Sequence, residues 1–234
     1  MMSTAPAPSS RPRWLWPAIA VGAVLLLLVG LGVGLLAGRD SEARPTQTAS
    51  ADGSSSGTAG GSDSACGLAP GSQEVPQKGP EAEWATLDRT VVPTSKTYGP
   101  TQIDGPLRTC YAHSPTGALF AAMNIGTALF APGGDKVLAE QVTDGPLKDS
   151  LKDQAGRHDE ESSADRAEIR AFSVTANDPD HVEVVVISQP AGASMKRIPL
   201  TMVWQDGDWR VDGQAQNQAE AIDSMEGYVP WSAP

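Results

Sequence analysis

The chain has 234 residues, of which 40% are hydrophobic, and a formal net charge of −11. Four basic and four acidic residues precede Cys66, which leaves 13 basic against 24 acidic residues in the rest of the chain. An acidic surface of this kind repels phosphates, so direct binding of nucleic acid by residues 66–234 is excluded.

Residues 17–37 read "PAIAVGAVLLLLVGLGVGLLA", a run of 21 residues without a charge. As a helix this run spans about 30 Å, the thickness of a bilayer's hydrocarbon core, and it predicts a transmembrane helix. A cleaved secretory signal is the alternative, but the run is long for one and no clear small-x-small cleavage site follows. Because residues 1–16 are short and basic, we expect a signal anchor in the plasma membrane with a cytoplasmic tail at 1–16 and an extracytoplasmic C-terminal part.

Residues 38–65 are dominated by Ser, Gly, Ala and Thr. Most of this stretch has no large apolar side chain whose burial could offset the entropy lost when a chain becomes ordered. The stretch therefore predicts a disordered linker. The extracytoplasmic domain then occupies residues 66–234. Its two cysteines, Cys66 and Cys110, are the only ones in the protein. An even pair in an oxidising compartment indicates a disulfide, and two unpaired buried thiols are the alternative.

Helix signals are dense from Ser114 onward in the stretch "CYAHSPTGALFAAMN". Ser114 suits the N-cap and Pro115 the first helical position, and the apolar residues that follow recur at helical spacing as far as Leu129. Two further helical stretches are predicted, at about 136–141 and from 144 or 146 to about 154.

The apolar period then changes from helical to alternating, which predicts strands at 168–175, 181–189, 196–205 and 208–212. Asp206-Gly207 is a strong hairpin signal, and in its two-residue register Trp204 lies opposite Trp209 as a core aromatic pair. The stretch "AEWATLDRTVVPTS" adds a strand at an edge. The order indicates an α+β domain in which helices pack on a curved antiparallel sheet of about four strands. Such a domain can hold a pocket in its concave face, but the inward-facing residues are apolar and favour an occluded core.

Catalytic chemistry has little support in the sequence. Ser114 beside His113 has a structural role at a helix start, and the Gly-x-Ser-x-Gly pattern of a nucleophile elbow is absent. His158 and His181 lack the spacing of metal ligands. We therefore expect no catalytic residues, no metal and no cofactor, and a protein that is not an enzyme.

Three segments carry a family resemblance: "GPLRTCYAHSPTGALFAAMNI", "MVWQDGDWRV" and "EGYVPWSAP". They resemble uncharacterised actinobacterial single-pass membrane proteins that often accompany integrative and conjugative elements. The layout also resembles the outer domain of assembly components of type IV secretion and conjugation machines. That resemblance implies a nuclear transport factor 2-like cone and a function in binding rather than catalysis.

The leading hypothesis is a non-enzymatic bitopic scaffold component of a conjugative DNA-transfer apparatus. Its partners would be other membrane or transfer-apparatus proteins and the lipid bilayer at 17–37, and the layout allows a homo-oligomer. A tethered extracytoplasmic ligand-binding or sensing module is the alternative. An extracytoplasmic enzyme is the third class, and it requires His113 or Ser114 to act in catalysis.

Overall fold

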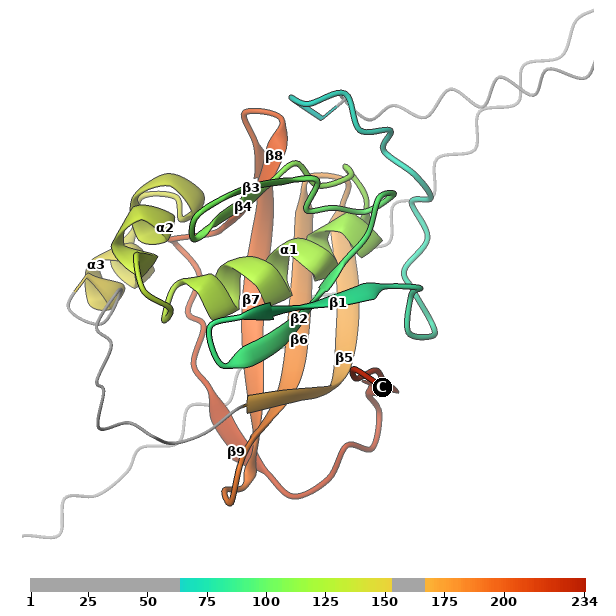
Figure 1. Cartoon of the computed structure of the whole chain (residues 1–234), viewed down its shortest axis with the longest axis vertical. Coiled ribbons are helices and arrows are strands. Elements are labelled where there is room, and N and C mark those ends of the chain that lie inside the picture. The colour runs from blue at the N-terminus through green and yellow to red at the C-terminus, as the bar shows by residue number, and fades with distance from the viewer. Residues whose placement is uncertain (1–63, 153–166) are drawn as a thin grey trace, which may run out of the picture. The chain divides into compact units, whose positions relative to one another are not determined.

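The computed structural model describes residues 64–152 and 167–234. In this part of the chain three helices lie among ten strands (Figure 1). The helices are α1 (Pro115–Ala128), α2 (Gly134–Gln141) and α3 (Pro146–Leu151). The strands are β1 (Glu83–Leu87), β2 (Thr90–Thr94), β3 (Gln102–Asp104), β4 (Leu107–Thr109), β5 (Ala167–Asp178), β6 (His181–Pro190), β7 (Met195–Gln205), β8 (Asp208–Val211), β9 (Glu220–Ile222) and β10 (Val229–Pro230).

One antiparallel sheet of six strands dominates the fold. Its order is β10-β5-β6-β7-β8, and β9 pairs with the beginning of β7. The hairpins β1-β2 and β3-β4 form two separate small sheets. α1 crosses one face of the large sheet and also contacts β2 and β4, so the helix lies between the sheet and the two hairpins (Figure 1).

The predicted fold class is wrong. The described part of the chain is mostly β, and its three helices are only 14, 8 and 6 residues long, so it is not a nuclear transport factor 2-like cone of helices on about four strands. The four predicted strands are present as β5 to β8, but two hairpins precede α1 and two more strands extend the sheet. The stretch "AEWATLDRTVVPTS", predicted to add one edge strand, forms the hairpin β1-β2, a sheet of its own. The other additional strands have only two or three residues, too few for an alternating pattern to be recognised.

No helix within 64–152 and 167–234 is long and apolar enough to cross a membrane. The predicted span at 17–37 and the predicted tail at 1–16 lie outside the described residues, as does the predicted linker except for its last two residues.

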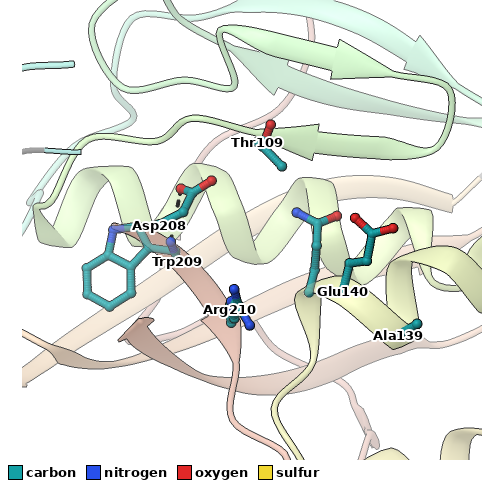
Figure 2. A pocket seen from close by; sticks show the side chains of 7 residues that line it. Thr109, Ala139, Glu140, Asp208, Trp209 and Arg210 are labelled. Carbon is teal, nitrogen blue, oxygen red and sulfur yellow. Dashed lines mark hydrogen bonds between the residues drawn. The ribbon is translucent and has the colours of Figure 1, made fainter. Parts of the chain in front are cut away.

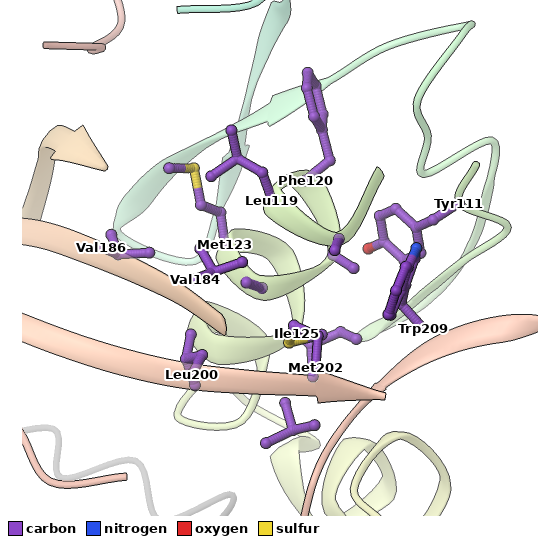
Figure 3. Packing of buried hydrophobic residues seen from close by; sticks show 14 of the residues in the cluster. Tyr111, Leu119, Phe120, Met123, Ile125, Val184, Val186, Leu200, Met202 and Trp209 are labelled. Carbon is purple, nitrogen blue, oxygen red and sulfur yellow. The ribbon is translucent and has the colours of Figure 1, made fainter. Parts of the chain in front are cut away.

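α1 is buried on nearly every side. Every residue from Pro115 to Ile125 is buried, where the sequence indicated a single apolar stripe. The small residues of the helix make this possible because they let neighbouring backbone approach. At Gly117 an added Cβ would lie 1.9 Å from the carbonyl oxygen of Ala112, so only glycine fits there. The helix therefore forms the centre of the core (Figure 3).

The β7-β8 hairpin presents its two tryptophans to the core. Trp204 pairs with Trp209, and Gln205 with Asp208, around the turn at Asp206-Gly207. Both turn residues have positive φ, 55° and 80°, as a two-residue type I′ turn requires. The two indole rings meet edge to face with centroids 5.3 Å apart. This arrangement covers the end of the sheet next to the start of α1.

The chain after β8 passes along the edge of β7 and covers the opposite face of the sheet. On that face Ala171, Val185 and Ile187 form a small second cluster, against which Met225 and Tyr228 pack together with other partly buried apolar side chains. β10 then pairs with β5, and Trp231 packs into the main core. Both faces of the central strands are thus covered.

Two phenylalanines provide a matched test of this core. Phe172 is fully buried and its ring meets that of Trp231 at 5.5 Å, whereas Phe130 is 52% exposed. We expect Phe172→Ala to lower the free energy of unfolding by about 3–5 kcal/mol because it leaves a cavity, and Phe130→Ala to lower it by less than about 1 kcal/mol. Urea unfolding of the full chain, followed by tryptophan fluorescence, measures both. Equal losses for the two variants would contradict this description of the core.

Candidate functional site

The segment that leads into α1 is held by β8. The Asp208 carboxylate accepts hydrogen bonds from the backbone N–H groups of Cys110 at 2.7 Å and Tyr111 at 3.0 Å, and also from that of Trp209 at 3.0 Å. Trp209 Nε1 donates to the carbonyl oxygen of Ala112 at 2.9 Å. Burial raises the pKa of the Asp208 carboxyl, an effect that outweighs the three backbone hydrogen bonds that lower it. One acidic residue of the hairpin thus fixes the backbone that precedes the helix.

Cys110 has φ of 72°, an uncommon conformation for a residue with a side chain. Its position is fixed on both sides, because its N–H binds Asp208 and its sulfur is bonded to Cys66 across a Cα–Cα distance of 5.9 Å. Ala65, next to Cys66, donates its N–H to the carbonyl oxygen of Gly207 at 2.9 Å. The disulfide therefore joins the start of the described chain to the helix entry and the β7-β8 turn.

His113 is buried in an aromatic setting. Its ring stacks on Trp204 with centroids 4.1 Å apart and an interplanar angle of 7°. Its Nε2 lies 3.0 Å from the carbonyl oxygen of Pro179 and 2.9 Å from Asp180 Oδ1, so this nitrogen donates to the β5-β6 turn. The ring therefore links the helix entry to the sheet.

Ser114 is the N-cap of α1, and Pro115 occupies the first helical turn. The Ser114 hydroxyl accepts a hydrogen bond from the N–H of Gly117 at 3.1 Å. Although His113 and Ser114 are neighbours in sequence, the interactions above give one a role in packing and the other a role in capping. Of the other two histidines, His181 contacts Asp178 at 3.0 Å and His158 lies outside the described residues. Within the part of the chain that the structure describes, no three His, Cys, Asp or Glu side chains form a metal site.

A polar pocket of about 370 Å³ lies between α2, β4 and β8 (Figure 2). Its walls are formed by Thr109, Ala139, Glu140, Gln141, Asp208, Trp209 and Arg210. Gln141 Nε2 donates to the carbonyl oxygen of Arg108 at 2.7 Å, but Gln141 Oε1 has no hydrogen-bond partner among the described residues. Since both Asp208 oxygens already accept backbone hydrogen bonds, this pocket offers few free groups for a ligand.

Arg108 is a buried cation that the sequence did not single out. Its side chain is only 6% exposed, and burial lowers the pKa of its guanidinium. In the described structure its Nε and Nη1, like the buried Tyr111 hydroxyl, have no hydrogen-bond partner. These groups do not line either of the two pockets described here.

A larger and more apolar cavity, which we call the apolar cavity, lies between the second half of α1, α3 and the large sheet. Its volume is about 430 Å³. The helices contribute Ala122, Met123, Gly126, Leu147 and Leu151, and the sheet contributes Ile169, Val186, Ile198 and Leu200, among others. The sequence favoured an occluded core at this face, so the cavity is a difference from expectation. It exists because small residues of α1 face the sheet here: at Gly126 the first obstacle to a Cβ is the Leu200 side chain at 3.2 Å.

Polar groups line part of this apolar cavity. Ser188 and Lys196 are paired across β6 and β7, and Asn217 lies on the segment that follows β8. Asn217 Oδ1 accepts from the Thr201 hydroxyl at 3.4 Å, whereas its buried Nδ2 has no acceptor within the described residues. An apolar cavity with a few polar groups is the usual composition of a small-molecule site. The sequence did not reveal these three residues, because they come together only through strand register.

The cap at Ser114 makes a prediction that separates capping from catalysis. We expect Ser114→Ala to lower the free energy of unfolding by about 1 kcal/mol because the N–H of Gly117 loses its acceptor, and Ser114→Gly to lower it by only a few tenths. Chemical unfolding of the full chain measures both variants against the unmodified protein. Unchanged stability in Ser114→Ala would show that the hydroxyl does not cap the helix.

The comparisons with known proteins add one result. A family described as "Domain of unknown function (DUF8175)" matches residues 45–230. No curated protein and no solved structure matches the chain. Since the match covers well over half of the sequence, the chain belongs to the DUF8175 family.

Proposed function

We propose that the folded part of this chain is a non-enzymatic binding module that holds an apolar small molecule in the apolar cavity. The observation that carries the proposal is the cavity itself, about 430 Å³ of space lined mostly by apolar side chains. That volume is within the range of small-molecule sites, about 300–1,000 Å³.

The surrounding core argues against an accidental packing gap. Protein interiors pack about as densely as organic crystals and hold few voids larger than a water molecule. Elsewhere the core of this protein is tightly filled: Leu119, Phe120 and Ile125 of α1 and Met202 of β7 have no exposed surface. The apolar space therefore lies beside a fully buried part of the core, which is the arrangement expected of a ligand site.

The predicted anchor at 17–37 and linker at 38–65 support a location for this module. A tether of that composition would hold the domain at the outer face of the plasma membrane, where it can sample apolar molecules near the bilayer. The location is part of the proposal.

A second proposal is that the chain serves as a scaffold component of a conjugative, type IV secretion-like apparatus. Its support is the predicted layout together with the resemblance of the helix-entry and C-terminal segments. One structural observation adds to it: Ile103 on the β3-β4 hairpin is 57% exposed, an apolar side chain in a position where another protein could cover it.

Binding of an apolar molecule can be followed at Met123, which lines the apolar cavity, with Met225 on the opposite face of the sheet as an internal control. In the full chain, reconstituted in lipid nanodiscs with isotope-labelled methionine methyl groups, we expect decanol to shift the Met123 resonance and to leave that of Met225 unchanged. Ala167→Phe, which places a ring at the cavity wall, should weaken this binding roughly tenfold. Ala176→Phe, at the exposed far end of the same strand, serves as the matched control. Absence of a Met123 shift at saturating decanol would overturn the proposed function.

The scaffold proposal is tested in cells that carry the transfer system. A photoreactive residue at position 103 should cross-link to a transfer ATPase or channel subunit, because the exposed side chain of Ile103 would lie in the contact. The same photoreactive residue placed at position 91 serves as the comparison with position 103. Val91 is 37% exposed but lies on a different hairpin. Undiminished DNA transfer after deletion of the gene would count against a scaffold role.

A further inference from the structure

Two polar residues that line the apolar cavity, Ser188 and Lys196, lie at one end of it. Ser188 pairs with Ile169 on one side and with Lys196 on the other, so these three residues form one row across β5, β6 and β7. Partners in an antiparallel register share a face of the sheet, and all three line the cavity. The row at this end of the sheet therefore carries a hydroxyl and an ammonium group.

The next rows along the same face are apolar. Val186 pairs with Ile198, and Val184 pairs with Leu200. From Lys196 to Leu200 the strand rises about 13 Å at ~3.3 Å per residue. A molecule lying along β7 would thus have one end beside the charged row and its body against apolar side chains of the sheet and of α1.

Ser188 and Lys196 both offer hydrogen-bond donors at this end of the cavity. Lys196 is exposed and has no ion-pair partner among the described residues. Asn217, which bonds Thr201 next to Leu200, lies toward the other end of the cavity, and its buried Nδ2 has no acceptor among the described residues. The remaining charged residue of the lining, Asp88, has an interaction of its own. The hydroxyl of Ser188 and the ammonium of Lys196 therefore favour a hydrogen-bond acceptor at this end, and the ammonium favours one with a negative charge.

We propose that the ligand of the apolar cavity is a medium-chain carboxylate, with its acyl chain against Ile198 and Leu200 and its carboxylate at Lys196. This inference rests on the proposed function and specifies the chemical class of its ligand. Ser188 supplies a further hydrogen bond to the head group. Because the domain as a whole is acidic, the attraction is local to Lys196 and is not a steering effect of the whole surface.

The test compares decanoate, decanol and decylamine, which share an apolar chain and differ in the head group. The full chain in lipid nanodiscs is titrated at free ligand concentrations set by dialysis, with the Met123 methyl resonance as the signal. We expect decanoate to bind about fivefold more tightly than decanol, and decylamine to bind more weakly than either. Lys196→Gln should remove the preference for decanoate, whereas Lys96→Gln, at an exposed lysine outside the cavity lining, should keep it.

Charge reversal provides the second arm. Lys196→Glu should make decylamine the preferred ligand, because the head-group site then carries the opposite charge. Equal binding of decanoate and decanol, or a preference unaffected by Lys196→Gln, would overturn the carboxylate assignment while leaving the cavity as an apolar site. Failure of all three ligands to shift Met123 would overturn the proposed function itself, so the two failures are distinguishable.

Discussion

The contact between the Asp208 carboxylate and the backbone before α1 determines how the helix meets the sheet. Cys110 and Tyr111 donate to it from the helix side, and Asp208 itself is the first residue of β8. Trp209 adds a bond from its indole N–H to Ala112 and places its ring against the core. Because the helix is almost entirely buried, its starting point fixes which of its side chains face each strand. The hairpin thus sets the position of the central element of the fold.

The same geometry explains why the core is packed at one end and open at the other. Near the helix entry, His113 fills the space between the two tryptophans and the β5-β6 turn. Toward the end of α1, small side chains such as Ala122 and Gly126 face the sheet, and the apolar cavity begins there. The start of α1 is held in place, and the side chains toward its end are small. The space therefore lies at the end of the helix, while the core at its start stays packed.

The sequence predicted local features well and the architecture poorly. The turn residues Asp206 and Gly207 have strict backbone requirements, and the Ser114-Pro115 pair has few roles other than starting a helix, so both patterns could be interpreted from neighbours in the chain. β9 and β10 consist of three and two residues whose pairing depends on distant strands, and no local pattern marks them. Asp208 looked like an ordinary hairpin residue, because its partners lie almost a hundred positions earlier. Ser188 and Lys196 lie in one row only because of the register of β6 and β7. The cavity depends on the path of the whole of α1, which no local pattern predicts.

The place of Trp231 has a consequence for how the protein is made. This residue contacts the rings of Trp84, Phe120 and Phe172, which belong to a hairpin, to α1 and to the sheet. A ribosome that has synthesised α1 and all of β5 to β8 has therefore not yet supplied a side chain that these three elements share. Until residue 231 emerges, Phe120 and Phe172 lack this contact, and the nascent domain presents apolar surface of the kind that chaperones bind. The core of this domain is completed only after β8 has been synthesised, whatever the order in which its strands pair.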